Sequence, residues 1–412
     1  MSNMANHNSV DERDSNLGPL ADIVVLDLSN ILSGPYCTML LADLGAEVIK
    51  VERPKVGDQS RRLGPQVKGD SAYFMSVNRG KKSITIDLSS SSGQELIGRL
   101  CKHADVLVEN FVPGTMKEFG LDYSILRSLN PRMIYASISG FGQDGPYAYK
   151  PAFDIIVQAM GGLMSVTGEP GGRPIRPGVS LGDSVAGILA ALAIVAALWE
   201  RNRTGRGRYL DLSMLDCQVT LMENAFSRFF ATGKVPGPLG SRHPAAVPFQ
   251  AFATLDGYIV VAIISDDGNV WAHFCDAISR PELANDTRFS ESLARVKNYE
   301  ALAKIIEDVL RQLSSEEWLR KFGELGVPCG PVNRIDTVTS DPQVLHRNMI
   351  AEIPHKRLGK WHVANTPFKF DGVSSKPRGP SPDLGEHTEI TLHELLGLSS
   401  TEISRLKSRG VI

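Results

Sequence analysis

Two aspartates, Asp183 and Asp154, stand where a carboxylate could act as a nucleophile. Asp183 directly precedes a long alanine-rich segment with the apolar pattern of a helix, and Asp154 precedes a second apolar segment. A helix dipole favours an ionised carboxylate at its N-terminus, and an ionised carboxylate can attack an acyl group. Ordinary helix N-caps occupy the same positions, so the residues alone leave both interpretations open. Gly182 and Gly187 are interpreted as room for a bulky substrate to approach the backbone.

Basic residues near two predicted strand ends could bind a phosphorylated ligand. Arg53 ends the second predicted strand, at the edge where α/β sheets bind ligands. Arg79, Lys81 and Lys82 precede the third strand, and a solvated surface cluster is the alternative interpretation for these three.

Several common chemistries lack their motifs. No HExxH or CxxC motif occurs and the 9 histidines are dispersed, so the sequence gives little support to a metal site. A complete Walker motif is also absent, which argues against ATP. A dinucleotide site and a serine triad are not expected either: GFGQDG at 140–145 follows a predicted strand but no helix is predicted directly after it, and GVSLG at 178–182 follows no predicted strand.

Composition narrows the class of protein further. The chain has 412 residues, of which 42% are hydrophobic and 22% are charged, as is ordinary for a globular protein. Its 44 basic residues nearly balance its 46 acidic residues, and this balance argues against nucleic acid or an anionic membrane as the main partner. The 5 scattered cysteines indicate reduced thiols and a cytoplasmic protein. The longest apolar run, 185–199, is predicted to be a buried helix of about 22 Å, too short to cross a membrane. Residues 1–18 are predicted to be a disordered tail.

β-branched runs alternate with helical patterns over the first 200 residues. Strands are predicted at 23–28, 47–51, 83–88, 105–109 and 133–138. Helices are predicted at 36–44, 93–103, 115–126, 153–163 and 185–200. This alternation predicts a Rossmann-like α/β domain with a mostly parallel sheet. A smaller α/β domain is predicted at about 228–328.

Eight short segments then carry a resemblance. They are SGP at 33–35, LGAEVIKVE at 44–52, NRGKKSI at 78–84, VENF at 108–111, SGFGQ at 139–143, TGRG at 204–207, GPVN at 330–333 and LGEHT at 384–388. In this order they make the chain resemble the family III CoA-transferases, the group of the formyl-CoA and carnitine-CoA transferases. The resemblance implies a large Rossmann-like domain from both chain ends (19–227 and a return segment, 329–412), a small domain (228–328) and an interlocked ring homodimer.

The resemblance also implies roles for particular residues. Asp183 falls on the nucleophile that carries the acyl group and then CoA, and Asp154 on a second acidic position of the pocket. Contacts to CoA are implied for Arg53, Ile86, Ser89, Asn110, Phe111, Leu32 and Ser33. Two positions depart from the family: Leu32 stands for a glutamine near the reacting carbonyl, and Glu118 for an arginine near CoA.

The expected reaction moves CoA from an acyl-CoA donor, succinyl-CoA by resemblance, to a free dicarboxylic acid, through an aspartyl anhydride and an aspartyl-CoA thioester. CoA thioester is then a substrate, and no permanently bound cofactor is expected. The segments 110–114, 174–179 and 341–346 resemble the dicarboxylate branch, and Arg176, Arg242 and His243 are the acceptor-site candidates.

Two alternatives remain. An α-methylacyl-CoA racemase of the same fold needs a base on each face of its substrate, and its His-Asp pair corresponds here to Phe153 and Asp154. A non-catalytic CoA-binding protein is the other alternative, although binding alone does not require a positioned nucleophile.

Overall fold

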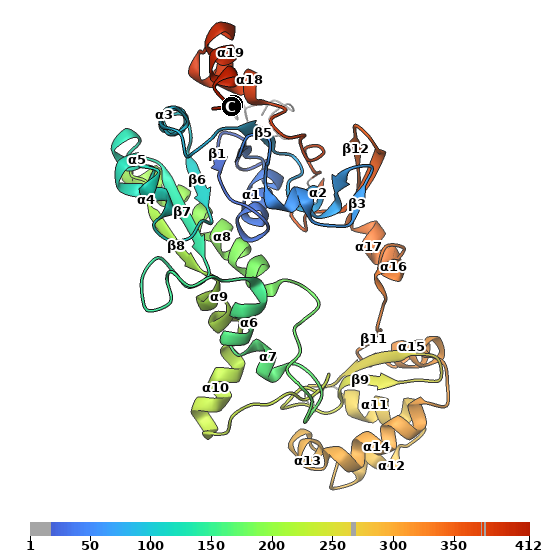
Figure 1. Ribbon diagram of the computed structural model, residues 1–412. Coiled ribbons are helices and arrows are strands. Elements are labelled where there is room, and N and C mark those ends of the chain that lie inside the picture. The colour runs from blue at the N-terminus through green and yellow to red at the C-terminus, as the bar shows by residue number, and fades with distance from the viewer. Residues whose placement is uncertain (1–17, 265–268, 372, 375) are drawn as a thin grey trace, which may run out of the picture. The chain divides into compact units, whose positions relative to one another are not determined.

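The computed structural model describes residues 18–264, 269–371, 373–374 and 376–412 (Figure 1). The tail expected at 1–18 lies outside the described residues except for Gly18. The chain forms two compact units, one from the residues up to Leu163 with Pro177–Phe226 and Pro342–Ile412, the other from Met164–Arg176 and Ser227–Asp341. The first unit therefore combines both chain ends. The domain limits expected from the sequence stay predictions.

A parallel six-stranded sheet forms the centre of the first unit, as the alternation of strands and helices predicted. Its strands are β1 (Val24–Asp27), β2 (Glu47–Glu52), β5 (Lys82–Thr85), β6 (Val106–Glu109), β7 (Ile134–Ser139) and β8 (Tyr209–Ser213). They lie in the order β5-β2-β1-β6-β7-β8, and every neighbouring pair is parallel. The order reverses direction between β1 and β6, and this switch point is where open α/β sheets bind ligands, outside the carboxyl ends of the strands.

The sheet is buried on both faces, which explains its nearly continuous apolar strands. Successive side chains alternate between the faces, so Val25 packs in one core cluster and Leu26 in the other. The helices of this unit are α1 (Ser33–Asp43), α2 (Ala72–Val77), α3 (Ser91–Leu100), α4 (Thr115–Glu118), α5 (Tyr123–Leu129), α6 (Asp154–Met160), α8 (Leu181–Thr204), α9 (Met214–Leu221), α17 (Pro342–His346), α18 (Thr388–Leu396) and α19 (Ser400–Ser408). A 3₁₀ helix, η2, spans Gln59–Arg62.

Two expected helices are each divided. The helix expected at 115–126 is α4 and α5, because Gly120 adopts a left-handed φ of 66° and Asp122 begins a new helix by accepting from the N–H groups of Ser124 and Ile125. The helix expected at 153–163 is α6 followed by α7 (Leu163–Val166), with Gly162 at a φ of 88° between them.

The C-terminal segment returns to the edge of the sheet beside β5. Thr85 N–H donates to Thr388 Oγ1 at 3.0 Å, and His387 N–H donates to the Ser83 carbonyl at 2.8 Å, so α18 is held beside β5 (Figure 1). The sequence pattern did not predict the small hairpins of this unit. They are β3 (Gln66–Val67) with β4 (Asp70–Ser71), β12 (Ile350–His355) with β13 (Gly359–Ala364), and β14 (Lys369–Phe370) with β15 (Val373–Ser374).

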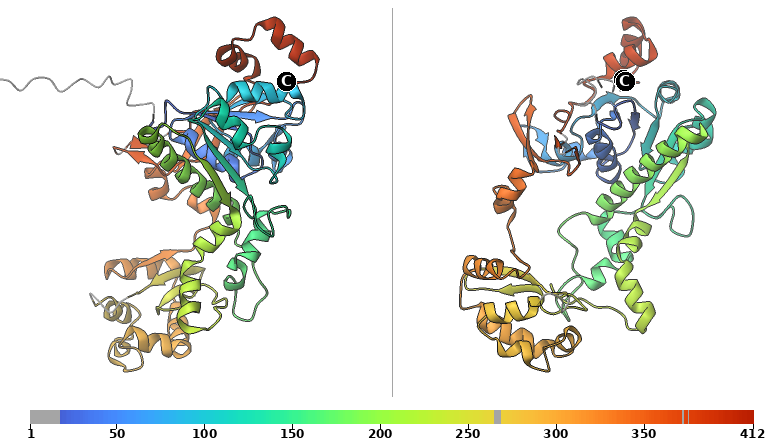
Figure 2. Two further views of the ribbon diagram at one scale, coloured as in Figure 1. Left: turned by 90° about the vertical axis from the view of Figure 1, so that its left-hand side faces the viewer. Right: turned by 180° about the vertical axis from the view of Figure 1, so that it is seen from behind.

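Helix α8 is longer than the apolar run that predicted it. It has 24 residues and is apolar and long enough, by length and composition alone, to cross a membrane, so the argument from its shortness was wrong. Helix α8 runs beside α1 (Figure 2). One face of α8 packs on α1 and on the sheet through residues such as Ala190 and Ile194. The opposite face exposes Ile188, Leu192 and Trp199 at 46%, 63% and 78%, so the expectation of a buried helix holds for one face only. The packed face is that of a core helix.

The second unit has an antiparallel three-stranded sheet covered by helices. Its strands are β9 (Phe249–Ala253), β10 (Tyr258–Ala262) and β11 (Cys329–Pro331), in the order β11-β10-β9. Its helices are α11 (Val270–Ala277), α12 (Glu282–Asn285), α13 (Ser292–Lys297), α14 (Tyr299–Leu310), α15 (Ser315–Glu324) and α16 (Ile335–Val338). Along the chain, α7 and α10 (Glu223–Thr232) cross from one unit to the other.

Candidate active site

A cavity of about 350 Å³ opens at the carboxyl ends of β1, β2, β5 and β6, at the switch point of the sheet. Four of the residues expected to contact CoA line it together: Arg53, Ile86, Ser89 and Phe111. The side chain of Arg53 is exposed, and Phe111 meets Phe119 edge to face with 6.3 Å between ring centroids. A cation beside apolar and aromatic walls suits a ligand that carries both a phosphate and a flat ring.

Of the other three expected CoA contacts, Leu32 and Ser33 lie at the start of α1 and Asn110 directly follows β6, and none of them lines the cavity. Asn110 uses its side chain within the protein: Oδ1 accepts from Asn30 N–H at 2.8 Å, and Nδ2 donates to the Asn30 carbonyl at 2.8 Å. Leu32 is the N-cap residue of α1, and Ser33 is its first residue. Asn30 itself lines the cavity, so Asn110 supports the cavity through the loop between β1 and α1.

Asp183 and Asp154 lie on two helices that touch. Asp183 is in the first turn of α8, half-buried, and the N-cap is Ser180, so the capping interpretation was wrong. Asp154 is the first residue of α6, with Phe153 as N-cap. Asp154 Oδ1 accepts from Gly182 N–H at 2.8 Å. The residue next to Asp183 is therefore tied to Asp154.

The glycines beside Asp183 permit close packing of helices rather than approach of a substrate. A Cβ on Gly182 would lie 2.6 Å from Val157 Cγ2 of α6, and a Cβ on Gly187 would lie 2.7 Å from the Ser33 carbonyl oxygen of α1. The expectation of space for substrate at these glycines was wrong. Their effect is to bring the first two turns of α8 against α6 and against the start of α1.

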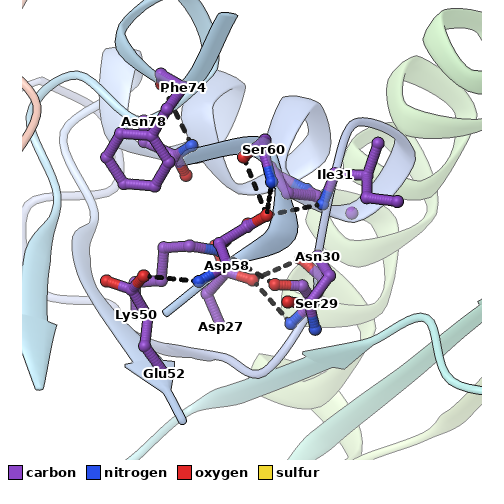
Figure 3. A network of polar contacts seen from close by, with 12 residues as sticks. Asp27, Ser29, Asn30, Ile31, Lys50, Glu52, Asp58, Ser60, Phe74 and Asn78 are labelled. Carbon is purple, nitrogen blue, oxygen red and sulfur yellow. Dashed lines mark hydrogen bonds and ion pairs between the residues drawn. The ribbon is translucent and has the colours of Figure 1, made fainter. Parts of the chain in front are cut away.

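Lys50 belongs to a buried charge network behind the β1–α1 loop, together with Asp27 and Asp58 (Figure 3). Lys81 joins this network through Asp27, and sequence analysis missed the network. Lys50 Nζ lies 2.8 Å from Asp58 Oδ2 and 3.9 Å from Asp27 Oδ2, and it donates to the Ser29 carbonyl. Burial alone would raise the pKa of Asp27. The two ammonium groups, together with hydrogen bonds from Ser29 and Thr38, outweigh burial and hold that pKa well below its ordinary value. Burial lowers the pKa of Lys81 to about 8.

The basic residues that precede the third strand are therefore not a surface cluster. Arg79 and Lys81 are 3% and 4% exposed. Arg79 donates to Asp43 at 2.6 Å, and Lys81 donates to Asp27 at 2.9 Å. Of the three, Lys82 alone is not buried: its side chain is partly exposed, and it pairs with Glu47 at 2.7 Å. With these internal partners, Arg79 and Lys81 serve the fold rather than a phosphorylated ligand.

Glu109 is a second buried group that sequence analysis did not single out. It accepts from Phe111 N–H at 2.8 Å, and it borders a cavity of about 340 Å³ lined by Tyr123, Tyr135 and Tyr209. Burial raises the pKa of Glu109 to about 7, although bonds from Ser137 and Phe111 oppose the shift.

The acceptor-site candidates Arg176, Arg242 and His243 all belong to the second unit. The Arg242 guanidinium lies 4.0 Å from the ring centroid of Tyr299, and the His243 ring lies 4.9 Å from that of Phe249. The predicted site residues thus fall into three groups: those that line the cavity or lie beside it, the acidic pair, and these second-unit residues. Glu118, exposed at the end of α4, does not line the cavity. Within the part of the chain that the structure describes, no group of three or more His, Cys, Asp or Glu side chains could hold a metal ion.

The parallel sheet with a cavity at its switch point places the chain in the doubly wound α/β class. Within that class it belongs to CoA-transferase family III, whose family model matches residues 20–388. This confirms the resemblance carried by the eight sequence segments.

Similar proteins span nearly the whole chain. A succinyl-CoA:glutarate CoA-transferase of Homo sapiens is 38% identical over 399 residues, which cover 97% of this chain and 91% of the relative. An acetyl-CoA:oxalate CoA-transferase of Acetobacter aceti is 40% identical over 371 residues, 90% of this chain and 94% of the relative. The crystal structure of a CAIB/BAIF family protein from Brucella suis matches with a TM-score of 0.82 at 38% identity, covering 92% of this chain and 99% of that one.

Proposed function

We propose that this family III CoA-transferase moves CoA from an acyl-CoA to a free dicarboxylate, with Asp183 as the nucleophile. The observation that carries the proposal is the place of Asp183 in the first turn of α8, on the unit that also holds the switch-point cavity. Glutarate and oxalate, the acceptors named for two relatives, are both dicarboxylates, which supports this acceptor class. The donors named for the same relatives differ, and succinyl-CoA is the donor we propose.

The proposed path balances without ATP. An oxygen of Asp183 attacks the thioester carbonyl, the C–S bond breaks, and CoA leaves as thiolate from an acyl-aspartyl anhydride. The thiolate attacks the aspartyl carbonyl of the anhydride and displaces the donor acid as carboxylate, which leaves an aspartyl-CoA thioester. The acceptor carboxylate attacks that thioester, which releases the thiolate and forms a new anhydride between the acceptor and Asp183. The thiolate then attacks the acceptor carbonyl of the new anhydride, so the acceptor thioester forms and Asp183 is regenerated.

Each group of site residues has a proposed task. CoA lies in the switch-point cavity, with Arg53 on its phosphates and Phe111 on its apolar wall. Asp154 fixes the first turn of α8 through Gly182 N–H and so orients Asp183 for attack. Arg176 or Arg242 binds the distal carboxylate of the acceptor. Phe153, at the position where a racemase would need a base, cannot exchange a proton, and this disfavours racemisation.

We further propose that two copies form the interlocked homodimer that the family resemblance implies, in the cytoplasm. The exposed residues Ile188, Leu192, Val195 and Trp199 follow one another at spacings of three and four, so they share one face of α8. Exposed apolar faces of this kind mark protein interfaces. Sedimentation of the purified chain is expected to give the mass of two copies, and a monomer would contradict the dimer.

A panel of free acids tests the function. The chain is incubated with succinyl-CoA or acetyl-CoA and each acid, and new thioesters are identified by mass. Dicarboxylates are expected to give product, and Asp183→Asn is expected to abolish it. Asp216→Asn is the matched control, because Asp216 holds the same place in the first turn of α9 in the same unit. Exchange that persists in Asp183→Asn would refute the nucleophile, and product with monocarboxylates only would refute the acceptor class.

A further inference from the structure

Ile31, in the loop between β1 and α1, has an unusual backbone conformation. Its φ is 67°, in the left-handed region that β-branched residues avoid because the side chain crowds the backbone. Such strain persists only where surrounding contacts hold it in place, and it concentrates at functional sites.

Side chains from two other segments hold this loop. Asp58 Oδ1 accepts from Ile31 N–H at 3.1 Å, and Asn110 bonds both the N–H and the carbonyl of Asn30 at 2.8 Å. Asp58 is itself fixed from behind, because Lys50 Nζ lies 2.8 Å from its Oδ2 and Ser60 N–H donates to its Oδ1 at 2.8 Å (Figure 3). Asp58 is 1% exposed, so this anchor is shielded from water.

The loop joins the two parts of the candidate active site in the first unit. At one end Asn30 lines the switch-point cavity, and Gly57 and Gln59, the neighbours of Asp58, line the same cavity. At the other end Ser33 packs against Gly187, one turn of α8 beyond Asp183. The conformation of Ile31 therefore sets the path of the backbone between the cavity and the helix that carries Asp183.

We propose that Asp58 is a positioning residue, which holds the β1–α1 loop in its strained conformation through Ile31 N–H and thereby aligns a bound thioester with Asp183. The inference rests on the proposed function. It assigns to Asp58 an effect on turnover that is separate from its pairing with Lys50.

A double-mutant cycle tests this, because glycine adopts the conformation of Ile31 without strain. Asp58→Ala is expected to lower kcat about tenfold with a smaller change in KM for the acyl-CoA. In the Ile31→Gly background the same substitution is expected to lower kcat less than about threefold. Ser279→Gly is the control background: Ser279 also has a left-handed φ, 58°, but belongs to the second unit, so the full tenfold effect is expected there.

Asp58→Asn removes the charge of residue 58 but keeps a hydrogen-bond acceptor in its place. It also provides the test if Asp58→Ala does not fold. Its amide oxygen can still accept from Ile31 N–H, although the ion pair with Lys50 is lost. It is therefore expected to unfold at lower denaturant than the wild type while keeping a kcat within about threefold of it. Equal losses of kcat in the Ile31 and Ile31→Gly backgrounds, or an Asp58→Asn variant as slow as Asp58→Ala, would overturn the inference. Wild-type turnover is measured alongside and tests the proposed function, so failure of the cycle in an active enzyme refutes only the role of Asp58.

Discussion

Replacing Lys50 with methionine tests the buried charge network most severely. Lys50 is fully buried on β2 and is the cation nearest to Asp58, at 2.8 Å. Methionine fills much of the same space but leaves Asp58 without its ion-pair partner. Breaking a buried ion pair from one side costs about 3–5 kcal/mol, because the remaining charge stays out of water.

Lys82→Met is the matched control on the neighbouring strand. Lys82 lies on β5, next to β2, and pairs with Glu47 at 2.7 Å, but their side chains are 39% and 40% exposed. Exposed pairs of this kind contribute about 0–1 kcal/mol. The two substitutions therefore remove the same charge from neighbouring strands of one sheet, and burial is the main difference between them.

Hydrogen exchange of peptides from β1 and β2, followed by mass spectrometry, gives the free energy of opening of this sheet. It suits a chain of two units, which need not unfold in a single step. At 1.36 kcal/mol per factor of ten, Lys50→Met is expected to speed exchange roughly 10²- to 10⁴-fold, and Lys82→Met less than about tenfold. Equal exchange rates in the two variants would refute the reasoning.

Further expectations concern helix packing, pH and CoA binding. Gly187→Ala is expected to destabilise the chain by about 1–3 kcal/mol in urea unfolding, because its Cβ would meet backbone of α1, whereas Gly323→Ala, with open space around it, is expected to be neutral or stabilising. Glu109 binds its proton more tightly in the folded chain (pKa about 7) than in the unfolded chain, so its contribution to stability is full below about pH 4.5 and is lost as pH rises through 7. The free energy of unfolding of the wild type is expected to fall by up to about 3 kcal/mol between pH 5 and 8 because of this group, and Glu109→Gln is expected to lack this fall. A Glu109→Gln variant with the same pH profile as the wild type would contradict this. Arg53→Ala is expected to raise KM for acyl-CoA about tenfold with little change in kcat, while Arg62→Ala, outside the cavity, is expected to leave KM unchanged.

The regular part of the fold could be predicted from local patterns. Apolar β-branched runs at a regular spacing predicted five strands of the parallel sheet, and β8 was missed because the exposed side chains of Tyr209 and Asp211 interrupt its apolar pattern. The hairpin of β12 and β13 was missed for the same reason, since exposed residues alternate with few buried ones along both strands.

The buried charges could not be located from the pattern alone. Lys50 sits between the apolar core residues Ile49 and Val51 of β2, and a charge at such a position signals a buried partner. The identity of that partner depends on tertiary contacts: it is Asp58, which follows a turn of the chain. Lys81, which pairs with Asp27 in the same network, comes from beyond α2. The exposed face of α8 was missed because an apolar run gives the same signal whether a neighbouring element covers it or not.

The central claim, that Asp183 takes the acyl group, is tested most directly by trapping. The wild-type chain is incubated with succinyl-CoA in the presence of hydroxylamine, digested, and examined by peptide mass spectrometry. The account predicts a hydroxamate at Asp183 that depends on succinyl-CoA, with Asp216 unmodified in the same digest. An unmodified Asp183 in a preparation that turns over would contradict it.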